Sequence, residues 1–430
     1  MGHSHHGDAA VVPVATRRIL VAALAPFFVA TAIGLVVLWP DTSRIDLGAP
    51  GVPAEELDAT VTDVASVDCP ELPGQERFRC SEVTAEIREG EDQGETFTFE
   101  YGAGPRTRAI EEGDDIFVGA SAEEDAPPGV AAPPKYFFVD FDRRLPLLAL
   151  GIAFSLVVIA LSRWRGLAAL AGLAVSLVVL VKFVLPAILS GSDPLAVAIV
   201  GGATIMFLAL YLAHGLNAAT TTAVFGTLAS LLLTGLLAVL FVELSIFTGA
   251  GSEEAVFVQI NQQQVNLEGL LLASIVIGTL GVLDDVTVTQ AAAVWELHHA
   301  NPRYGIRNLY RSGIRIGRDH IASTVNTLVL AYAGASLPLL ILFSVSNRGL
   351  TQVVNTETVA EEVVRTLVGS IGLVASVPIT TALAAWVVTS GRRAQGEPDA
   401  GAEEGEGAEE GEGAEEYVAP RREREFRDGS

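Results

Sequence analysis

Long apolar runs are the feature that most constrains the fold of this sequence. Between Leu145 and Val388 the chain consists mostly of Leu, Val, Ala and Gly, interrupted by short polar segments. A helix needs about 20 such residues to cross the hydrocarbon core of a bilayer. A soluble globular protein does not contain so many runs of this length. The sequence therefore predicts an α-helical membrane bundle.

The net charge of -24 is compatible with this prediction because charged and apolar residues occupy different parts of the chain. Acidic residues are concentrated in residues 53–125 and 397–425. Such segregation indicates polar domains on different sides of a bilayer, whereas a uniformly acidic surface would indicate basic partners. The expected partner is the lipid bilayer, and no nucleic-acid partner is expected.

The first span is predicted at residues 17–40. Arg17 and Arg18 precede the apolar run, and basic residues mark the cytoplasmic side of a membrane. No clear small-residue cleavage site precedes Trp39, so we interpret this run as a retained anchor rather than a signal peptide. The histidine-containing residues 1–16 are expected to be a disordered N-terminus in the cytoplasm.

Residues 41–143 follow a different pattern and predict an extracytoplasmic domain. Five segments alternate polar and apolar side chains and contain β-branched and aromatic residues, which is typical of strands. Five short strands indicate a small β-barrel of OB-like size, closed or nearly closed, inserted after the first helix. The strands are expected near residues 58–64, 77–87, 95–101, 115–119 and 136–141.

Cys69 and Cys80 are the only cysteines, and both lie in this β domain. An even pair close in sequence and outside the cytosol predicts one disulfide that closes a short loop. Two unpaired buried thiols are the alternative.

Seven further spans are predicted in residues 144–390, giving about eight transmembrane helices in all. With the N-terminus inside, every short loop with more than one arginine is cytoplasmic, as the positive-inside rule requires. Both termini are thus expected in the cytoplasm. The Glu-rich tail, residues 391–430, is predicted to be disordered. The seven spans are expected near residues 145–162, 166–189, 194–213, 218–243, 267–294, 320–345 and 364–388.

Two adjacent carboxylates in the span at 267–294 are the main candidate for an ion-coupling site. Asp284 and Asp285 directly follow an apolar run, and ionisable residues at membrane depth are usually functional. Asp285 belongs to a stripe of small and polar residues at helical spacing, which lets a neighbouring helix approach closely. The stripe consists of Ser274, Gly278, Gly281, Asp285, Thr289, Ala292 and Glu296. If the apolar span instead ends at Leu283, both aspartates lie among the cytoplasmic headgroups.

Polar residues around the next span are candidate partners for the aspartates. Arg318 and Asp319 lie at its cytoplasmic end, and Asn326, Thr327 and Tyr332 follow at membrane depth. These side chains can hydrogen-bond to the helix that carries the aspartates. For Asn326 and Thr327, hydrogen bonding that only holds helices together is the alternative.

Arginines repeat at helical spacing from Arg303 to Arg318, just before this span. The pattern predicts a short basic amphipathic helix on anionic lipid of the inner leaflet. An ordinary positive-inside loop is the alternative.

The chain contains, in this order, the segments Asp140–Arg143, Leu185-Pro-Ala-Ile-Leu-Ser-Gly, Gly278–Asp285, Ser312-Gly-Ile-Arg-Ile-Gly-Arg-Asp and Asn326-Thr-Leu-Val-Leu-Ala-Tyr-Ala-Gly. Together these segments resemble the YibE/F-like family of bacterial multi-spanning membrane proteins. The resemblance covers roughly residues 55–390, and in it Asp285 is the better match to the family's single aspartate. It implies the topology given above and a bacterial plasma (inner) membrane, but no settled reaction. The segment Gly281-Val-Leu-Asp-Asp-Val-Thr-Val is also similar to the paired-aspartate helix of proton-driven RND exporters.

The leading hypothesis from the sequence is an ion- or proton-coupled transporter with Asp284 and Asp285 as the coupling site. The rival is a non-transporting scaffold or sensor whose external β domain binds a partner, whose identity the sequence does not indicate. The sequence contains no Ser-His-Asp order, no His-Glu-x-x-His, no phosphate loop and no CxxC pair. An enzyme, a cofactor and a metal site are therefore not expected.

Overall fold

The computed structural model describes residues 13–41, 43, 56–68, 79–103, 108–120, 135–262, 264–345 and 348–394, and divides into two compact units. One unit, residues 35–214 and 248–273, contains the β domain and the helices that follow it. The other unit contains residues up to 34, residues 215–247, and the chain from Ser274 onward. The described residues of this second unit form helices and connecting turns, without a strand, and the unit is called the bundle unit below.

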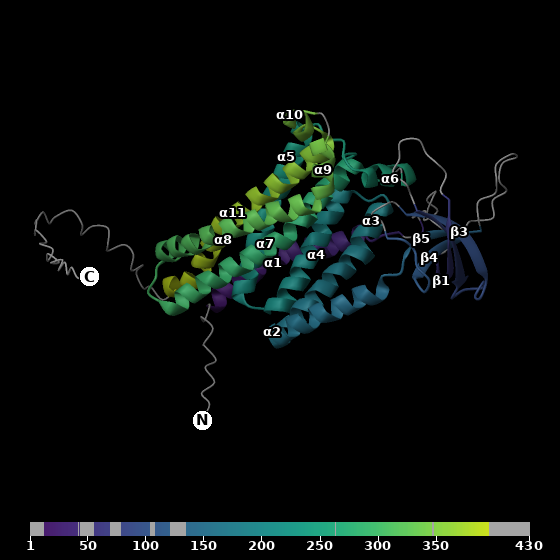
Figure 1. Cartoon of the computed structure of the whole chain (residues 1–430). Helices are drawn as coiled ribbons and strands as arrows, with labels where there is room; N and C mark the ends of the chain where they lie inside the picture. The colour runs from purple at the N-terminus through teal and green to yellow at the C-terminus, as the bar shows by residue number, and fades with distance from the viewer. Residues whose placement is uncertain are drawn as a thin grey trace, which may run out of the picture. The chain divides into compact units, whose positions relative to one another are not determined.

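The β domain, whose strands β1, β3, β4 and β5 are labelled in Figure 1, is one antiparallel sheet with the strand order β3-β2-β1-β4-β5. All five predicted strands are present. The sheet differs from the expected barrel in being a curled half-barrel: within the described ranges, β3 and β5 are outer strands without a pairing register between them. The strands are β1 (Glu56–Val67), β2 (Arg79–Ile87), β3 (Thr96–Ala103), β4 (Asp115–Ala120) and β5 (Tyr136–Phe141).

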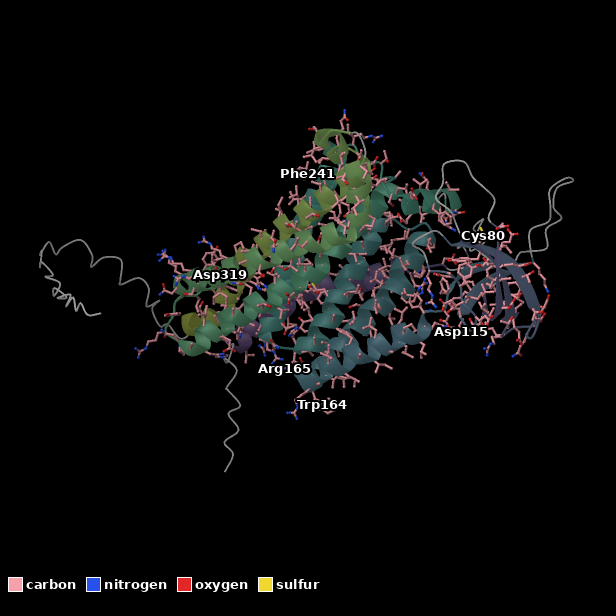
Figure 2. All side chains as sticks on the ribbon, viewed as in Figure 1. Cys80, Asp115, Trp164, Arg165, Phe241 and Asp319 are labelled. Atoms are coloured by element: carbon pink, nitrogen blue, oxygen red, sulfur yellow. The ribbon has the colours of Figure 1, made fainter. Side chains whose placement is uncertain are left out.

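Alternation along the strands explains why one face of the sheet forms a core. Leu57, Ala59 and Val61 of β1 are buried, and each is separated from the next by a polar residue on the other face. Cys80 lies in β2 and is labelled in Figure 2. Cys69 lies outside the described residues, so the Cys69–Cys80 disulfide stays a prediction.

Arg144 connects the β domain to the helix that follows it. Its guanidinium forms ion pairs with Asp58 of β1 and with Asp142, the latter at 2.9 Å. The same group lies 4.9 Å from the centroid of the Phe117 ring in β4. One side chain at the start of α2 (Arg144–Val179) therefore holds two strands of the sheet.

This connection is expected to weaken in acid. The Arg144 guanidinium lowers the pKa of Asp142 below its usual value of 3.8, and Arg143 does the same for Asp140. Groups with a lowered folded-state pKa stabilise the fold above the unfolded pKa and lose that contribution as the pH falls below it. The protection factors of the β1 amides, which are corrected for the intrinsic pH dependence of exchange, should therefore fall below pH 3.8 in the wild type. In Arg144→Gln, the protection factors should already be lower at neutral pH and should change less on acidification. An identical pH profile of β1 protection in the wild type and in Arg144→Gln would contradict the role of Arg144 in holding the sheet.

In the part of the chain that the structure describes, six helices are long and apolar enough to cross a membrane, and a seventh crossing results if α8 and α9, bent by 64°, form one broken span. This set indicates a multi-pass membrane protein, while the number of crossings stays a prediction. The helical elements are α1 (Val14–Val37), α2 (Arg144–Val179), η2 (Leu180–Val184), α3 (Leu185–Leu189), α4 (Pro194–His214), α5 (Ala218–Leu244), α6 (Glu253–Asn261), α7 (Leu267–Ala300), α8 (Ile306–Ala335), α9 (Leu337–Val345), α10 (Leu350–Val354) and α11 (Glu357–Ala394).

The helical segment from α2 through α3 is a hairpin rather than one rod. It has 46 residues, enough for about 69 Å of helix, more than twice the thickness of a hydrocarbon core. Arg163 has a positive φ of 51°, and a Cβ atom on Gly166 would lie 2.5 Å from the Val158 carbonyl oxygen. Residues eight apart in a straight helix are about 12 Å apart. The chain therefore reverses near Trp164 and Arg165, labelled in Figure 2, at the place where the sequence predicts a loop between two spans.

The arginine-rich segment is not a separate helix. α8 is continuous from Ile306 to Ala335, so it joins the predicted basic helix at 303–318 to the span predicted from 320. The reason is that Gly313 and Gly317 are buried against α7 and α11, which fixes the first half of α8 in the bundle unit. Binding of anionic lipid by its exposed arginines stays a prediction.

Candidate functional site

Two helices of the bundle unit, α5 and α11, contact each other through reciprocal glycine–threonine pairs. The Thr380 side chain of α11 occupies the space where Gly226 of α5 lacks a Cβ atom. In the same way, Thr234 of α5 occupies the space beside Gly372 of α11. Gly226 comes before Thr234 along α5, whereas their partners on α11 follow the opposite order, with Thr380 after Gly372. The two helices are therefore antiparallel. Small residues allow this close approach, as is common between membrane helices.

The two helices share the sequence pattern Gly-x-x-x-Ser-x-x-x-Thr. It occurs at residues 226–234 in α5 and at residues 372–380 in α11. The antiparallel register places Ser230 opposite Ser376 midway between the two contacts, and both serines are fully buried. The same motif in opposite directions gives the pair a local pseudo-two-fold symmetry. This repeat was readable in the sequence as two small-residue motifs of equal spacing.

Asp284 lies beside this helix pair. Its carboxylate is adjacent to the hydroxyl of Thr227, the residue after Gly226. The Thr227 and Thr287 hydroxyl groups are hydrogen-bonded at 2.7 Å, and the Thr287 hydroxyl donates to the Asp284 carbonyl at 3.2 Å. Both threonines are fully buried. Asp284, Thr227 and Thr287 therefore form one polar cluster between α5 and α7, called the Asp284 cluster below.

One oxygen of the Asp284 carboxylate is left without a partner in this cluster. Oδ1 is buried, and no hydrogen-bond donor among the described residues reaches it. An ionised carboxylate without a partner is costly to bury, whereas a proton or a bound cation removes that cost. The geometry therefore suits a group that takes up and releases a positive charge.

The structure separates the two predicted aspartates. Asp285 is exposed, as are Gly278, Gly281 and Glu296 of the stripe to which it belongs. The buried face of α7 instead carries larger residues such as Leu283 and Val286. Asp285 is thus not part of the Asp284 cluster, although it is the better match in the family resemblance.

Gln290 lies on α7, one to two turns after Asp284, and joins three helices. Its amide nitrogen donates to the Gly313 carbonyl of α8 at 2.8 Å and to the Thr381 hydroxyl of α11 at 2.7 Å. Gln290 is buried, and the glycines of α8 leave room for it. Sequence reasoning did not select this residue, although an amide at membrane depth was a usable signal.

The predicted partners on α8 divide into two groups. Arg318, Asp319, Asn326 and Thr327 are exposed in the structure, and Asp319 is labelled in Figure 2. Tyr332 is half-buried, and its hydroxyl lies next to Gly278 of α7. Of the five, Tyr332 is therefore the one with an observed approach to the helix that carries the aspartates.

Glu357, Glu361 and Glu362, which precede the span predicted near residues 364–388, lie in the first turns of α11. Arg365 forms an ion pair with Glu362 at 2.7 Å, and both interact electrostatically with Tyr332. Glu361 is 7% exposed. The charged residues from Glu357 to Arg365 recur at helical spacing and continue into the predicted span without a helix breaker. This spacing is the sequence signal from which the start of α11 could have been predicted.

A family model for YibE/F-like proteins matches residues 150–390, which is more than half of the chain. The comparisons with curated proteins and with solved structures gave no match. The matched region includes the α5–α11 pair and the Asp284 cluster. Together with the apolar helices, the match identifies an integral membrane protein, and the chain belongs to the YibE/F-like family.

Proposed function

We propose that this protein is a proton- or cation-coupled transporter in which Asp284 is the coupling group. The observation that carries the proposal is the buried Oδ1 atom of Asp284 between α5 and α7, which has no hydrogen-bond partner among the residues that the structure describes. Ionisable groups inside a membrane bundle are typical of ion pathways and proton relays. Protonation or cation binding at Asp284 changes the charge of the helix contact, and that change can favour one packing of α5 against α7 over another.

The α5–α11 pair supports this proposal. Secondary transporters are often built from inverted repeats, with the substrate site near their interface and alternating access by movement of one repeat against the other. The shared Gly-x-x-x-Ser-x-x-x-Thr motif in antiparallel helices is the local signature expected of such a relation. Thr227 links this pair directly to the Asp284 cluster.

The topology proposed with this function has eight crossings, both termini in the cytoplasm and residues 41–143 outside the cell. Counting the two halves of the α2–α3 hairpin and the bent α8–α9 pair supports eight crossings. The arginines at the hairpin turn and along α8 support the orientation through the positive-inside rule.

Ion binding at Asp284 is tested by thermal stability of the full-length protein in detergent over a pH series and a panel of monovalent and divalent cations. A ligand that binds only the folded state stabilises it by about 2.7 kcal/mol at 100 times its Kd. Wild-type protein and Asp285→Asn should respond to the same pH step or cation, and Asp284→Asn should not. Equal responses in all three proteins would exclude Asp284 as the binding group.

A further inference from the structure

The hydrogen bonds of the Asp284 cluster have a direction that follows from counting protons. The Thr287 hydroxyl lies 3.2 Å from the main-chain carbonyl oxygen of Asp284, and a carbonyl oxygen only accepts. The single proton of Thr287 is therefore donated to this carbonyl. The hydrogen bond of 2.7 Å between the two threonine hydroxyl groups then takes its proton from Thr227. The chain thus runs from Thr227 to Thr287 and ends at the Asp284 carbonyl.

This direction leaves the carboxyl group of Asp284 without a donor. Thr227 lies next to the carboxyl group, but its proton is directed to Thr287, so it presents only lone pairs to Asp284. The buried Oδ1 atom likewise has no donor among the described residues. Adjacent oxygen atoms that present only lone pairs repel each other. The contact between Asp284 and Thr227 therefore requires a positive charge between them.

The helices around Asp284 do not supply that charge. The one titratable residue of α5 is the exposed Glu243, and in α11 none follows Arg365 until the last turn. Arg365 itself is paired with Glu362 at 2.7 Å. On α7 the neighbouring carboxylate, Asp285, is exposed, as are the arginines of α1 and α8. The half-buried titratable residues of α8 are His320 and Tyr332.

We propose that the coupling ion at Asp284 is a proton, held between the carboxyl group and the Thr227 hydroxyl. A neutral carboxyl group has one O–H donor, and the lone pairs of Thr227 accept it. A metal ion such as Ca²⁺ takes about six to eight oxygen ligands, more than the carboxyl group and one hydroxyl provide. By naming the ion, this inference deepens the proposed transport function and rests on it.

Release of this proton changes the contact between α5 and α7. The Asp284 carboxylate and the Thr227 oxygen then repel each other, and Thr227 cannot turn its proton toward Asp284 without breaking its bond to Thr287. Deprotonation therefore weakens the contact between the two helices at this point. Thr227 and Thr287 act as positioning residues, because together they decide which oxygen faces the carboxyl group without a proton.

The test is infrared difference spectroscopy of the full-length protein in a maltoside detergent, which contains no carbonyl group. The C=O stretch of a neutral carboxylic acid is separate from the stretches of a carboxylate. At neutral pH we expect this band in the wild type and in Asp285→Asn, and its loss in Asp284→Asn. Thr227→Val should shift the band to higher frequency because the acceptor is lost, whereas Thr227→Ser should leave it in place.

Three results would overturn the proposal: no such band in the wild type, its loss when Na⁺, K⁺ or Ca²⁺ is added at constant pH, or an unshifted band in Thr227→Val. The comparison of the two aspartate variants holds even if Thr227→Val does not fold. None of these spectra requires transport, so they are separate from flux measured in liposomes. Flux that depends on Asp284 without the wild-type band would leave the transporter proposal standing with another cation.

Discussion

Asn in place of Asp284 should reduce gradient-driven flux at least tenfold while leaving the protein folded. Asn keeps the size and hydrogen-bonding shape of Asp but neither carries a charge nor takes up a proton. If the Asp284 cluster couples transport to an ion, the variant loses the step in which that ion binds, and flux by the coupled route stops. The measurement uses purified protein in liposomes with an imposed pH or cation gradient and an internal dye for the same ion.

Asp285→Asn is the matched control because Asp285 is the next residue but lies on the exposed face of α7. It should retain most of the wild-type flux. Thr227→Val should lie between the two, since it removes the hydroxyl next to the carboxylate but keeps the side-chain volume. Wild-type flux in a folded Asp284→Asn protein would refute the coupling role, and loss of flux in Asp285→Asn alone would transfer it to the other carboxylate.

The elements of this fold were predictable because they depend on local patterns. Period-two alternation located all five strands, and the run of apolar residues located the helices on both sides of the turn near Trp164. The closure of the sheet was not predictable in the same way. Whether β3 pairs with β5 depends on sheet curvature, and alternation along one strand says nothing about curvature.

Which face of α7 is buried was harder to predict from the sequence than the closure of the sheet. The sequence offers a small-residue stripe through Asp285 and a bulky face through Leu283 and Val286, and membrane helices can pack on either kind of face. The structure buries the bulky face and brings Asp284 to Thr227. Hydropathy does not decide this choice, because lipid and bundle interior are both apolar. The partner on α5 decides it, and that partner is 57 residues away in sequence.

A second large effect, a loss of protein stability, is expected for substitutions where α5 crosses α11. Gly226→Val or Gly372→Val should each destabilise the protein by about 1–3 kcal/mol, the usual cost of extra methyl groups in a packed core. Each new side chain would overlap the threonine of the other helix, Thr380 or Thr234. The apparent melting temperature of the detergent-solubilised protein should fall accordingly. Gly235→Val on α5 is the control, since a Cβ atom there meets nothing within 4 Å.

The control matters because Gly→Val changes helix propensity as well as volume. Valine is a better helix former than glycine, so propensity alone predicts a small gain at all three positions. A loss at Gly226 and Gly372 with a gain or no change at Gly235 therefore isolates the steric overlap. Exchanging the partners, Gly226→Thr together with Thr380→Gly, should restore stability toward wild type, because the volume at the contact is then conserved. If the exchange is no more stable than Gly226→Thr alone, the two residues are not in contact and the antiparallel register of α5 and α11 is wrong.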